Sequence, residues 1–237
     1  MKKNNVYESD DIRCVTGNTL RPGGFLLTNR AVLLCDISKG QKVLDVGCGM
    51  GATVDFLKSE FKIDAYGIDP SQKLIDRGRE VKNLPIIKGI GESIPYNNKS
   101  FDVVFTECTL SLMQKYEDTL QEIYRVLKPG GFVIISDVFA KEPDYIDELK
   151  NSNVQTCLRG LLDIGKLLIE IEKRGFEVIT LEDWTSLLKQ LMVDIIFKYD
   201  SMDKFWNVTT CENCSDFKTK LSLCKPGYFF MIAKKGD

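Results

Sequence analysis

Three glycines at alternate positions, Gly47, Gly49 and Gly51, directly follow an apolar segment and constrain the fold more than any other feature. Residues 42–46 are apolar enough for a strand that is buried on both faces, and apolar residues recur at helical spacing after Gly51. Glycine has no Cβ and tolerates positive φ, so the chain can turn tightly here and present backbone N–H groups at a helix N-terminus. The pattern predicts a strand, a turn that another molecule approaches closely, and a helix.

A carboxylate stands at the end of the next apolar segment, at Asp69. In nucleotide-binding folds, an acidic residue about 20 positions beyond the glycine turn accepts hydrogen bonds from ribose hydroxyls. The dinucleotide pattern is G-x-G-x-x-G, whereas this chain has G-x-G-x-G with Asp45 two residues ahead of it. The spacing therefore disfavours a nicotinamide-dependent dehydrogenase and favours S-adenosylmethionine as the nucleotide.

Several segments resemble, in the right order, the motifs of class I S-adenosylmethionine-dependent methyltransferases. Residues 43–51 are similar to the first motif and residues 68–71 to the second. Two later segments, 89–105 and 125–131, look like those of the branch that acts in ubiquinone and menaquinone biosynthesis. The resemblance covers residues 20–140 well and the remainder only in outline. It implies a methyltransferase with S-adenosyl-L-methionine as its cofactor.

Two weaker similarities concern other parts of the chain. Several cysteines in the later segments resemble the arrangement in arsenite methyltransferases, although the full motif set of that family is absent. Residues 21–24 and 225–229 are similar to segments of methyltransferases associated with peptide maturation. These similarities leave the methyl acceptor open among a soft thiol, a metalloid and a peptide-derived nucleophile.

The resemblance also implies a set of cofactor contacts. Asp45 would order the turn and approach the methionyl amino group, the backbone around Cys48 would contact the methionyl part, and Asp69 would bind the ribose. Arg21 is either a partner of the cofactor carboxylate or an arginine exposed to solvent, and Glu107 is either a cofactor contact or a candidate base. The full set of predicted cofactor-binding residues is Arg21, Asp45, Gly47, Cys48, Gly49, Asp69, Gly91, Glu92 and Glu107.

One position departs from the family. Relatives usually carry aspartate where this chain has Ile90, and that carboxylate accepts a hydrogen bond from the adenine amino group. Here the apolar side chain would pack on the adenine ring, and the backbone of Gly91 and Glu92 would supply polar contacts. The resemblance therefore predicts an adenine site that differs from the usual one.

The remaining pattern predicts alternating strands and helices, which is typical of a parallel sheet with helices on both faces. The family adds an antiparallel last strand between the fifth and sixth strands. We therefore expect a Rossmann-like, doubly wound, mostly parallel seven-stranded α/β sheet. The expected strands are 43–46, 64–69, 86–89, 102–107, 132–138, 176–182 and 228–233, and the expected helices include 26–36, 51–60, 71–81 and 116–128.

We expect residues 1–237 to form a single methyltransferase domain, because no low-complexity linker divides them. Residues 1–40 would form a helical arm, and residues 139–174 and 183–226 would be elaborations of the core. Ligands in open α/β sheets bind outside the carboxyl ends of the strands, where these connections begin. The additions are thus expected to cover the cofactor and shape the acceptor site.

The charge and hydropathy of the chain indicate its cellular location and the kinds of partner it binds. With 32 basic and 34 acidic residues, the chain lacks the positive charge of a nucleic-acid-binding protein. No apolar run reaches the ~18 residues of a membrane span, and the N-terminus has no signal-peptide core. We expect a cytoplasmic protein with a small-molecule or peptide-derived acceptor, without nucleic acid or a membrane span; its oligomeric state stays open.

The cysteines are mostly expected to be buried thiols, since free cysteine packs as a small hydrophobe. An alternative is that Cys48, Cys108, Cys157, Cys211, Cys214 and Cys224 face one cleft. A structural zinc site normally needs four ligands, which the pair Cys211 and Cys214 does not supply, so no metal is predicted. Aromatic residues at Phe197, Tyr199, Phe205 and Trp206 are expected in the core, with an apolar substrate pocket as the alternative.

The absence of histidine excludes a histidine-based triad and a histidine-ligated metal. Methyl transfer does not need histidine, because the sulfonium is already activated and the protein mainly orients an in-line displacement. No catalytic residue is therefore assigned. The sequence predicts a methyltransferase, and the alternative is a cofactor-binding module that has lost its chemistry and acts as a partner or sensor.

Overall fold

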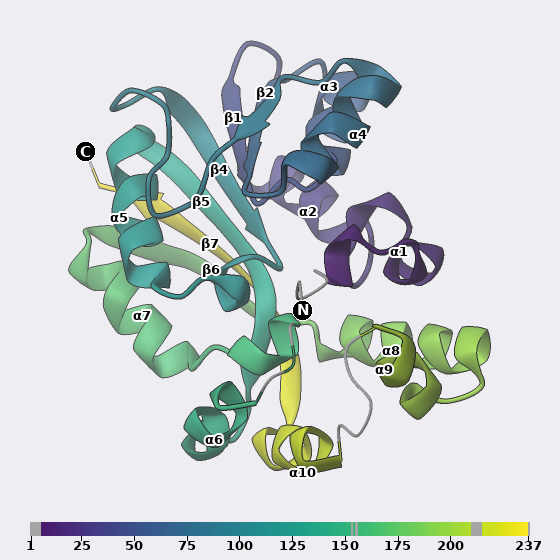
Figure 1. Ribbon diagram of the computed structural model, residues 1–237. Helices are drawn as coiled ribbons and strands as arrows, with labels where there is room; N and C mark the ends of the chain where they lie inside the picture. Colours follow the sequence, from purple (N-terminus) through teal and green to yellow (C-terminus); the bar gives the residue numbers. More distant parts are fainter. Residues whose placement is uncertain (1–5, 153, 155, 210–214, 237) are drawn as a thin grey trace.

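The computed structural model describes residues 6–152, 154, 156–209 and 215–236, and it contains one mixed sheet with helices on both faces (Figure 1). The strand order is β3-β2-β1-β4-β5-β7-β6. The strands are β1 (Lys42–Val46), β2 (Asp64–Asp69), β3 (Ile86–Lys88), β4 (Phe101–Glu107), β5 (Leu127–Ala140), β6 (Phe176–Asp183) and β7 (Pro226–Lys235). The α-helices are α1 (Asp10–Thr16), α2 (Leu26–Leu34), α3 (Ala52–Phe61), α4 (Gln72–Lys82), α5 (Tyr116–Val126), α6 (Ile146–Lys150), α7 (Ile164–Lys173), α8 (Thr185–Tyr199), α9 (Met202–Thr209) and α10 (Ser215–Cys224).

The expected fold is confirmed, including the position of the last strand. Strands β3, β2, β1, β4 and β5 pair in parallel, and β7 is antiparallel to both β5 and β6. Helices α3, α4 and α5 connect β1 to β2, β2 to β3 and β4 to β5, since parallel neighbours need a crossover connection. The carboxyl ends of β1, β2 and β4 consequently lie at one edge of the sheet, which is where ligands bind in such folds.

Two boundaries differ from the expectation around residue 128. Helix α5 ends at Val126, and β5 already begins at Leu127, which pairs with Phe101 of β4. The helix cannot include Lys128, because the ring of Pro129 disfavours the α conformation of the residue before it. Gly130 then adopts a φ of 72° in the turn that leads into the long part of β5.

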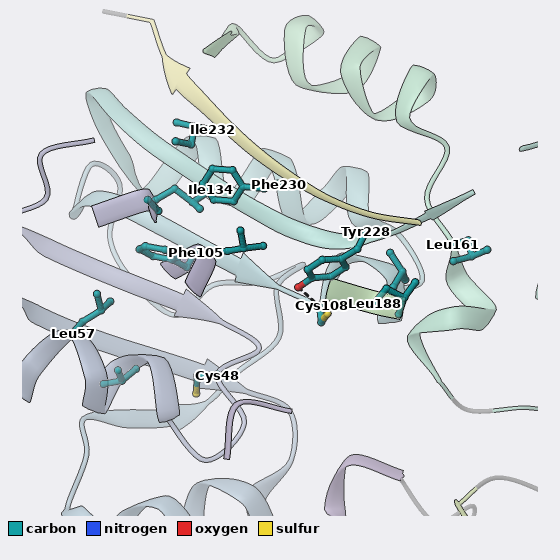
Figure 2. Packing of buried hydrophobic residues seen from close by; sticks show 14 of the residues in the cluster. Cys48, Leu57, Phe105, Cys108, Ile134, Leu161, Leu188, Tyr228, Phe230 and Ile232 are labelled. Atoms are coloured by element: carbon teal, nitrogen blue, oxygen red, sulfur yellow. Dashed lines mark hydrogen bonds between the residues drawn. The ribbon is translucent and has the colours of Figure 1, made fainter. Parts of the chain in front are cut away.

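Apolar residues fill both faces of the sheet, since adjacent residues of each central strand point to opposite sides. Val43 of β1 belongs to the cluster beneath α3, whereas the adjacent Leu44 belongs to the cluster beneath α5 and α7. Figure 2 shows part of the first cluster, in which Phe105, Ile134 and Phe230 bring β4, β5 and β7 together. Such strands read as apolar runs without alternation because helices cover both faces.

The segments outside this core gather beyond one end of the sheet (Figure 1). Short 3-10 helices lie among them: η1 (Val6–Glu8), η2 (Gly17–Thr19), η3 (Leu110–Leu112), η4 (Pro143–Tyr145) and η5 (Cys157–Gly160). Helix α1 lies near α8 and α9, and α6 lies near α10. Within the described ranges, no helix has the length and apolarity needed to cross a membrane.

We predict that Gly78→Ala destabilises the protein through a contact between α4 and the glycine turn. An ideal Cβ at Gly78 would lie 2.3 Å from the carbonyl oxygen of Met50, a backbone atom that cannot move aside without displacing the turn. Overpacking of this kind costs roughly 1–3 kcal/mol, measurable as a lower free energy of unfolding in urea. The control is Gly165→Ala, in helix α7, where the nearest atom is the Asp163 Oδ1 at 3.3 Å. Equal effects in the two variants would contradict the tight contact.

Candidate functional site

The glycine turn between β1 and α3 is held by backbone hydrogen bonds. Gly47, Gly49 and Gly51 have φ angles of 83°, 55° and 82°. The N–H groups of Gly47 and Cys48 donate to the carbonyl oxygen of Ile68, at 2.8 and 3.0 Å. A Cβ at Gly47 would lie 2.3 Å from the Thr109 Cγ2, so both conformation and space require glycine at that position.

Asp69 connects this turn to the end of β2. Its Oδ2 accepts a hydrogen bond from the Gly49 N–H at 2.9 Å, and its Oδ1 accepts one from the Ser71 N–H at 2.8 Å. Burial raises the pKa of the Asp69 carboxyl, and the two backbone donors partly offset that rise. Each oxygen keeps a second lone pair, so the carboxylate can still accept hydrogen bonds from a ligand.

A cavity of about 590 Å³ opens at the carboxyl edge of the strands, beside the turn. Its wall includes the first residues of α3, where the N-terminus of the helix favours negative charge. All the predicted cofactor-binding residues line this one cavity: Arg21, Asp45, Gly47, Cys48, Gly49, Asp69, Gly91, Glu92 and Glu107. The sequence therefore identified a set of residues that the fold brings together, from segments up to about 90 residues apart in the chain.

Asp45 is a buried acidic residue in the wall of the cavity. Its side chain lies at the end of β1 and the residue is only 4% exposed, yet no donor among the described residues hydrogen-bonds to its carboxylate. Burial raises its pKa well above the ordinary value, and the charge of Glu107 raises it further, whereas Arg21 lowers it. An unpaired buried carboxylate is costly. The cavity wall is thus prepared for a ligand that is cationic or donates hydrogen bonds.

Arg21 and Glu107 form a buried ion pair at the back of the cavity, with a 3.0 Å separation between the Arg21 Nη2 and the Glu107 Oε2. The alternative of a solvent-exposed arginine is wrong, because Arg21 is only 6% exposed. Arg21 donates to the hydroxyls of Thr28 and Thr53, and these hydroxyls donate in turn to the two oxygens of Glu107. The network ties the N-terminal arm and α3 to the end of β4.

The loop after β3 forms another wall of the cavity. An ideal Cβ at Gly91 would lie 2.7 Å from the Thr119 Oγ1, so the loop packs closely on α5. Glu122 accepts a hydrogen bond from the Ile94 N–H at 2.9 Å, and Arg125 donates to the Ile94 carbonyl oxygen at 2.9 Å. Ile90 lines the cavity and is 48% exposed, so its apolar side chain is available to a flat ring.

The cysteines do not all converge. The Cys48 side chain packs against Gly67, and Cys224 is buried at the end of α10. Only Cys108 and Cys157 share a second cavity, and Cys211 and Cys214 lie outside the described residues. In the part of the chain that the structure describes, no three cysteine or acidic side chains are grouped so that they could hold a metal ion.

Sequence reasoning missed several residues that organise the site. Thr28 and Thr53 belong to the Arg21–Glu107 network, and Tyr7 lines the cavity. Asp137, in β5, accepts hydrogen bonds from the Ser111 hydroxyl at 2.6 Å and the Ser111 N–H at 3.0 Å. No local pattern marks these side chains, because each acts through a partner that is distant in sequence.

Comparisons with known proteins agree with this geometry. Residues 44–135 match the family described as a methyltransferase domain. Phosphoethanolamine N-methyltransferase 3 of Arabidopsis thaliana is 26% identical over 191 residues, which cover 78% of this chain and 35% of that protein. Arsenite methyltransferase of Halobacterium salinarum is 27% identical over 183 residues, which cover 73% of this chain and 46% of that protein. This chain therefore spans less than half the length of these two relatives.

A solved structure shows the same fold over nearly the whole chain. Phosphoethanolamine N-methyltransferase 2 of Haemonchus contortus, in complex with phosphomonomethylethanolamine and S-adenosylhomocysteine, has a TM-score of 0.70. Its sequence is 20% identical, and the likeness covers 96% of this chain and 57% of that one. At this identity the comparison establishes the fold.

We predict that Asp137 makes stability fall as the pH rises from about 4 to about 6. Burial raises the pKa of its carboxyl from 3.8 to about 6, so the folded state binds a proton that the unfolded state has lost in this window. The stabilisation from this proton is complete below about pH 4 and is lost as the pH passes about 6. Urea unfolding of Asp137→Asn and the wild type across this range checks the slope. Parallel curves for the two proteins would contradict it.

Proposed function

We propose that this protein, whose chain carries a class I methyltransferase domain over residues 44–135, transfers a methyl group from S-adenosylmethionine to a small-molecule acceptor. The observation that carries the proposal is the buried, unpaired carboxylate of Asp45 beside the glycine turn. The methionyl end of S-adenosylmethionine offers an ammonium group, which would give this carboxylate the hydrogen-bonded cationic partner that it lacks among the described residues.

The other residues of the cavity suit the rest of the cofactor. Asp69 would accept hydrogen bonds from the ribose hydroxyls while it continues to hold the glycine turn. Ile90 and Gly91 would lie against the adenine ring, and Glu92 would flank it. The backbone from Gly47 to Gly49 would contact the methionyl part, and the Arg21–Glu107 pair would support it from behind.

The chemistry needs little from the protein beyond alignment. S-adenosylmethionine supplies an activated methyl group, and in-line displacement by the acceptor transfers it. The chain would bind and orient the two reactants and exclude water, which together account for much of the acceleration in such reactions. No histidine is present in the sequence, and no base is required when the acceptor atom is already nucleophilic.

The relatives act on different acceptors, as the names phosphoethanolamine N-methyltransferase and arsenite methyltransferase state. We therefore propose a small-molecule acceptor without naming it from a relative. A soft thiol, a metalloid and a peptide-derived nucleophile are the classes that the sequence suggests. The additions at residues 1–40, 139–174 and 183–226 would shape the acceptor site within one methyltransferase domain, and we propose a cytoplasmic location.

We predict that Asp45→Asn weakens the binding of S-adenosylhomocysteine at least tenfold. The product keeps the ammonium group, and the loss of one charge from a buried pair costs more than about 1.4 kcal/mol. Isothermal titration calorimetry measures the two affinities, and Asp216→Asn, at an exposed site on α10, is the matched control. Unchanged affinity for the Asp45 variant, or tighter binding of NAD than of S-adenosylhomocysteine by the wild type, would overturn the assignment.

We also predict turnover. Incubation of the protein with S-adenosylmethionine labelled on the methyl carbon and a metabolite extract should yield a labelled product, which mass spectrometry detects. The Asp45→Asn variant serves as the weak-binding control. If S-adenosylhomocysteine binds tightly but extracts yield no product, the chain is a cofactor-binding module rather than an enzyme.

A further inference from the structure

A second, smaller cavity of about 80 Å³ adjoins the cavity of about 590 Å³ that we propose to hold S-adenosylmethionine. The larger one is called the cofactor cavity below. The two cavities share Tyr7, Leu20 and Cys108 in their walls. The smaller one extends away from the glycine turn and is enclosed by residues from α1, α8, α9 and the segment around Cys157. Figure 2 shows Leu188 of α8 beside Cys108, at the end of the sheet where this cavity lies.

The described residues that line the smaller cavity carry no formal charge. Among the described residues that line it, none is aspartate, glutamate, lysine or arginine, and most are apolar, including Leu188, Ile195, Phe205 and Trp206. Burial raises the pKa of the Cys157 thiol to about 11 and that of the Tyr7 hydroxyl well above its ordinary range. Both groups are therefore neutral at physiological pH. A charged ligand would lose its hydration here without gaining a partner.

The two thiols in the walls add no charge to the smaller cavity. The Cys108 thiol donates a hydrogen bond to the Tyr228 hydroxyl at 3.4 Å, and that hydroxyl donates to the Ser136 hydroxyl at 3.2 Å. Burial and the nearby Asp137 charge raise the pKa of Cys108 well above its ordinary range. Both thiols are therefore protonated at neutral pH and pack here as small apolar groups.

We propose that this smaller cavity, defined by Tyr7, Leu20, Cys108, Leu188, Ile195 and Trp206, receives the apolar and uncharged part of the methyl acceptor. The inference rests on the proposed function, and it selects among acceptors by charge. The acceptor atom would lie in the passage beside Tyr7, Leu20 and Cys108, because displacement requires direct contact between the two reactants. Phosphorylated amines do not fit these walls.

The transfer step balances without a protein base. A lone pair on the acceptor atom forms the new bond to the methyl carbon, and the bond from that carbon to the sulfonium sulfur breaks with its electron pair staying on sulfur. S-adenosylhomocysteine leaves as a neutral thioether. If the acceptor is an uncharged amine, the proton that its nitrogen carries after the transfer goes to water. A nucleophile that is reactive when uncharged suits walls that offer no ionised group.

The first experiment tests whether a neutral apolar molecule binds in the smaller cavity, and it does not depend on methyl transfer. Trp206 lies in the wall, and Trp184→Phe leaves it as the only tryptophan in the chain. The probes are trichloroethanol and trichloroacetate, which have the same trichloromethyl group and differ in charge. We expect saturable quenching of Trp206 fluorescence by trichloroethanol and none by trichloroacetate. Saturable quenching by trichloroacetate, or no saturable quenching by either, would overturn the proposal.

Substitutions then locate the probe. Leu188→Phe fills the cavity and should raise the half-saturation concentration of trichloroethanol about tenfold, a loss of about 1.4 kcal/mol, while S-adenosylhomocysteine affinity stays the same. Met192→Phe, from a more exposed wall position, is the second variant, and Phe197→Leu is the control because Phe197 is 84% exposed on the same helix. Unchanged quenching in both wall variants would contradict the assignment.

Turnover separates this inference from the proposed function. With labelled S-adenosylmethionine, aniline, whose amino group is uncharged and nucleophilic at neutral pH, should accept the methyl group at a rate above background, whereas phosphoethanolamine should not. Faster methylation of phosphoethanolamine than of aniline would overturn the inference and leave the methyltransferase assignment intact. Failure to bind S-adenosylhomocysteine would overturn the proposed function, and the quenching experiment would still decide whether the smaller cavity admits neutral apolar molecules.

Discussion

The rest of the site depends on the contact between the glycine turn and the Asp69 carboxylate. Asp69 accepts hydrogen bonds from the backbone of Gly49 and of Ser71, so one buried side chain fixes the turn after β1 relative to the start of α4. The positive φ angles of the turn and its close approach to Thr109 complete the constraint. Beside the fixed turn, Asp45 is buried without a hydrogen-bond donor among the described residues, and it lines the cavity.

Local sequence patterns are sufficient to predict the strands of the sheet and many of the residues that line the larger cavity. The glycine spacing and the apolar runs predicted the strands because a parallel sheet buries both faces. Long-range pairs were not predictable in this way. The sequence allows Arg21 to be either a cofactor partner or an exposed residue, and it contains no sign that Thr28 and Thr53 join Arg21 to Glu107. The end of α5 was also misplaced, although Pro129 marks it.

The two adjoining cavities differ in the charge of the residues that line them. The cofactor cavity contains buried acidic groups, and the adjoining cavity has no ionised group among the described residues in its wall. This contrast would suit a charged methyl donor in the larger cavity and the uncharged part of an acceptor in the smaller one. The described cysteines do not gather at one cleft, because Cys48 and Cys108 line the larger cavity, Cys108 and Cys157 line the smaller one, and Cys224 is buried at the end of α10.

The most direct test of the central claim is a crystal structure of the protein with S-adenosylhomocysteine. We expect the ligand ammonium to lie within hydrogen-bonding distance of the Asp45 carboxylate, at about 2.7–3.2 Å. We expect the ribose hydroxyls to donate hydrogen bonds to the Asp69 carboxylate. A ligand bound elsewhere, or one that leaves the Asp45 carboxylate without a partner, would contradict it.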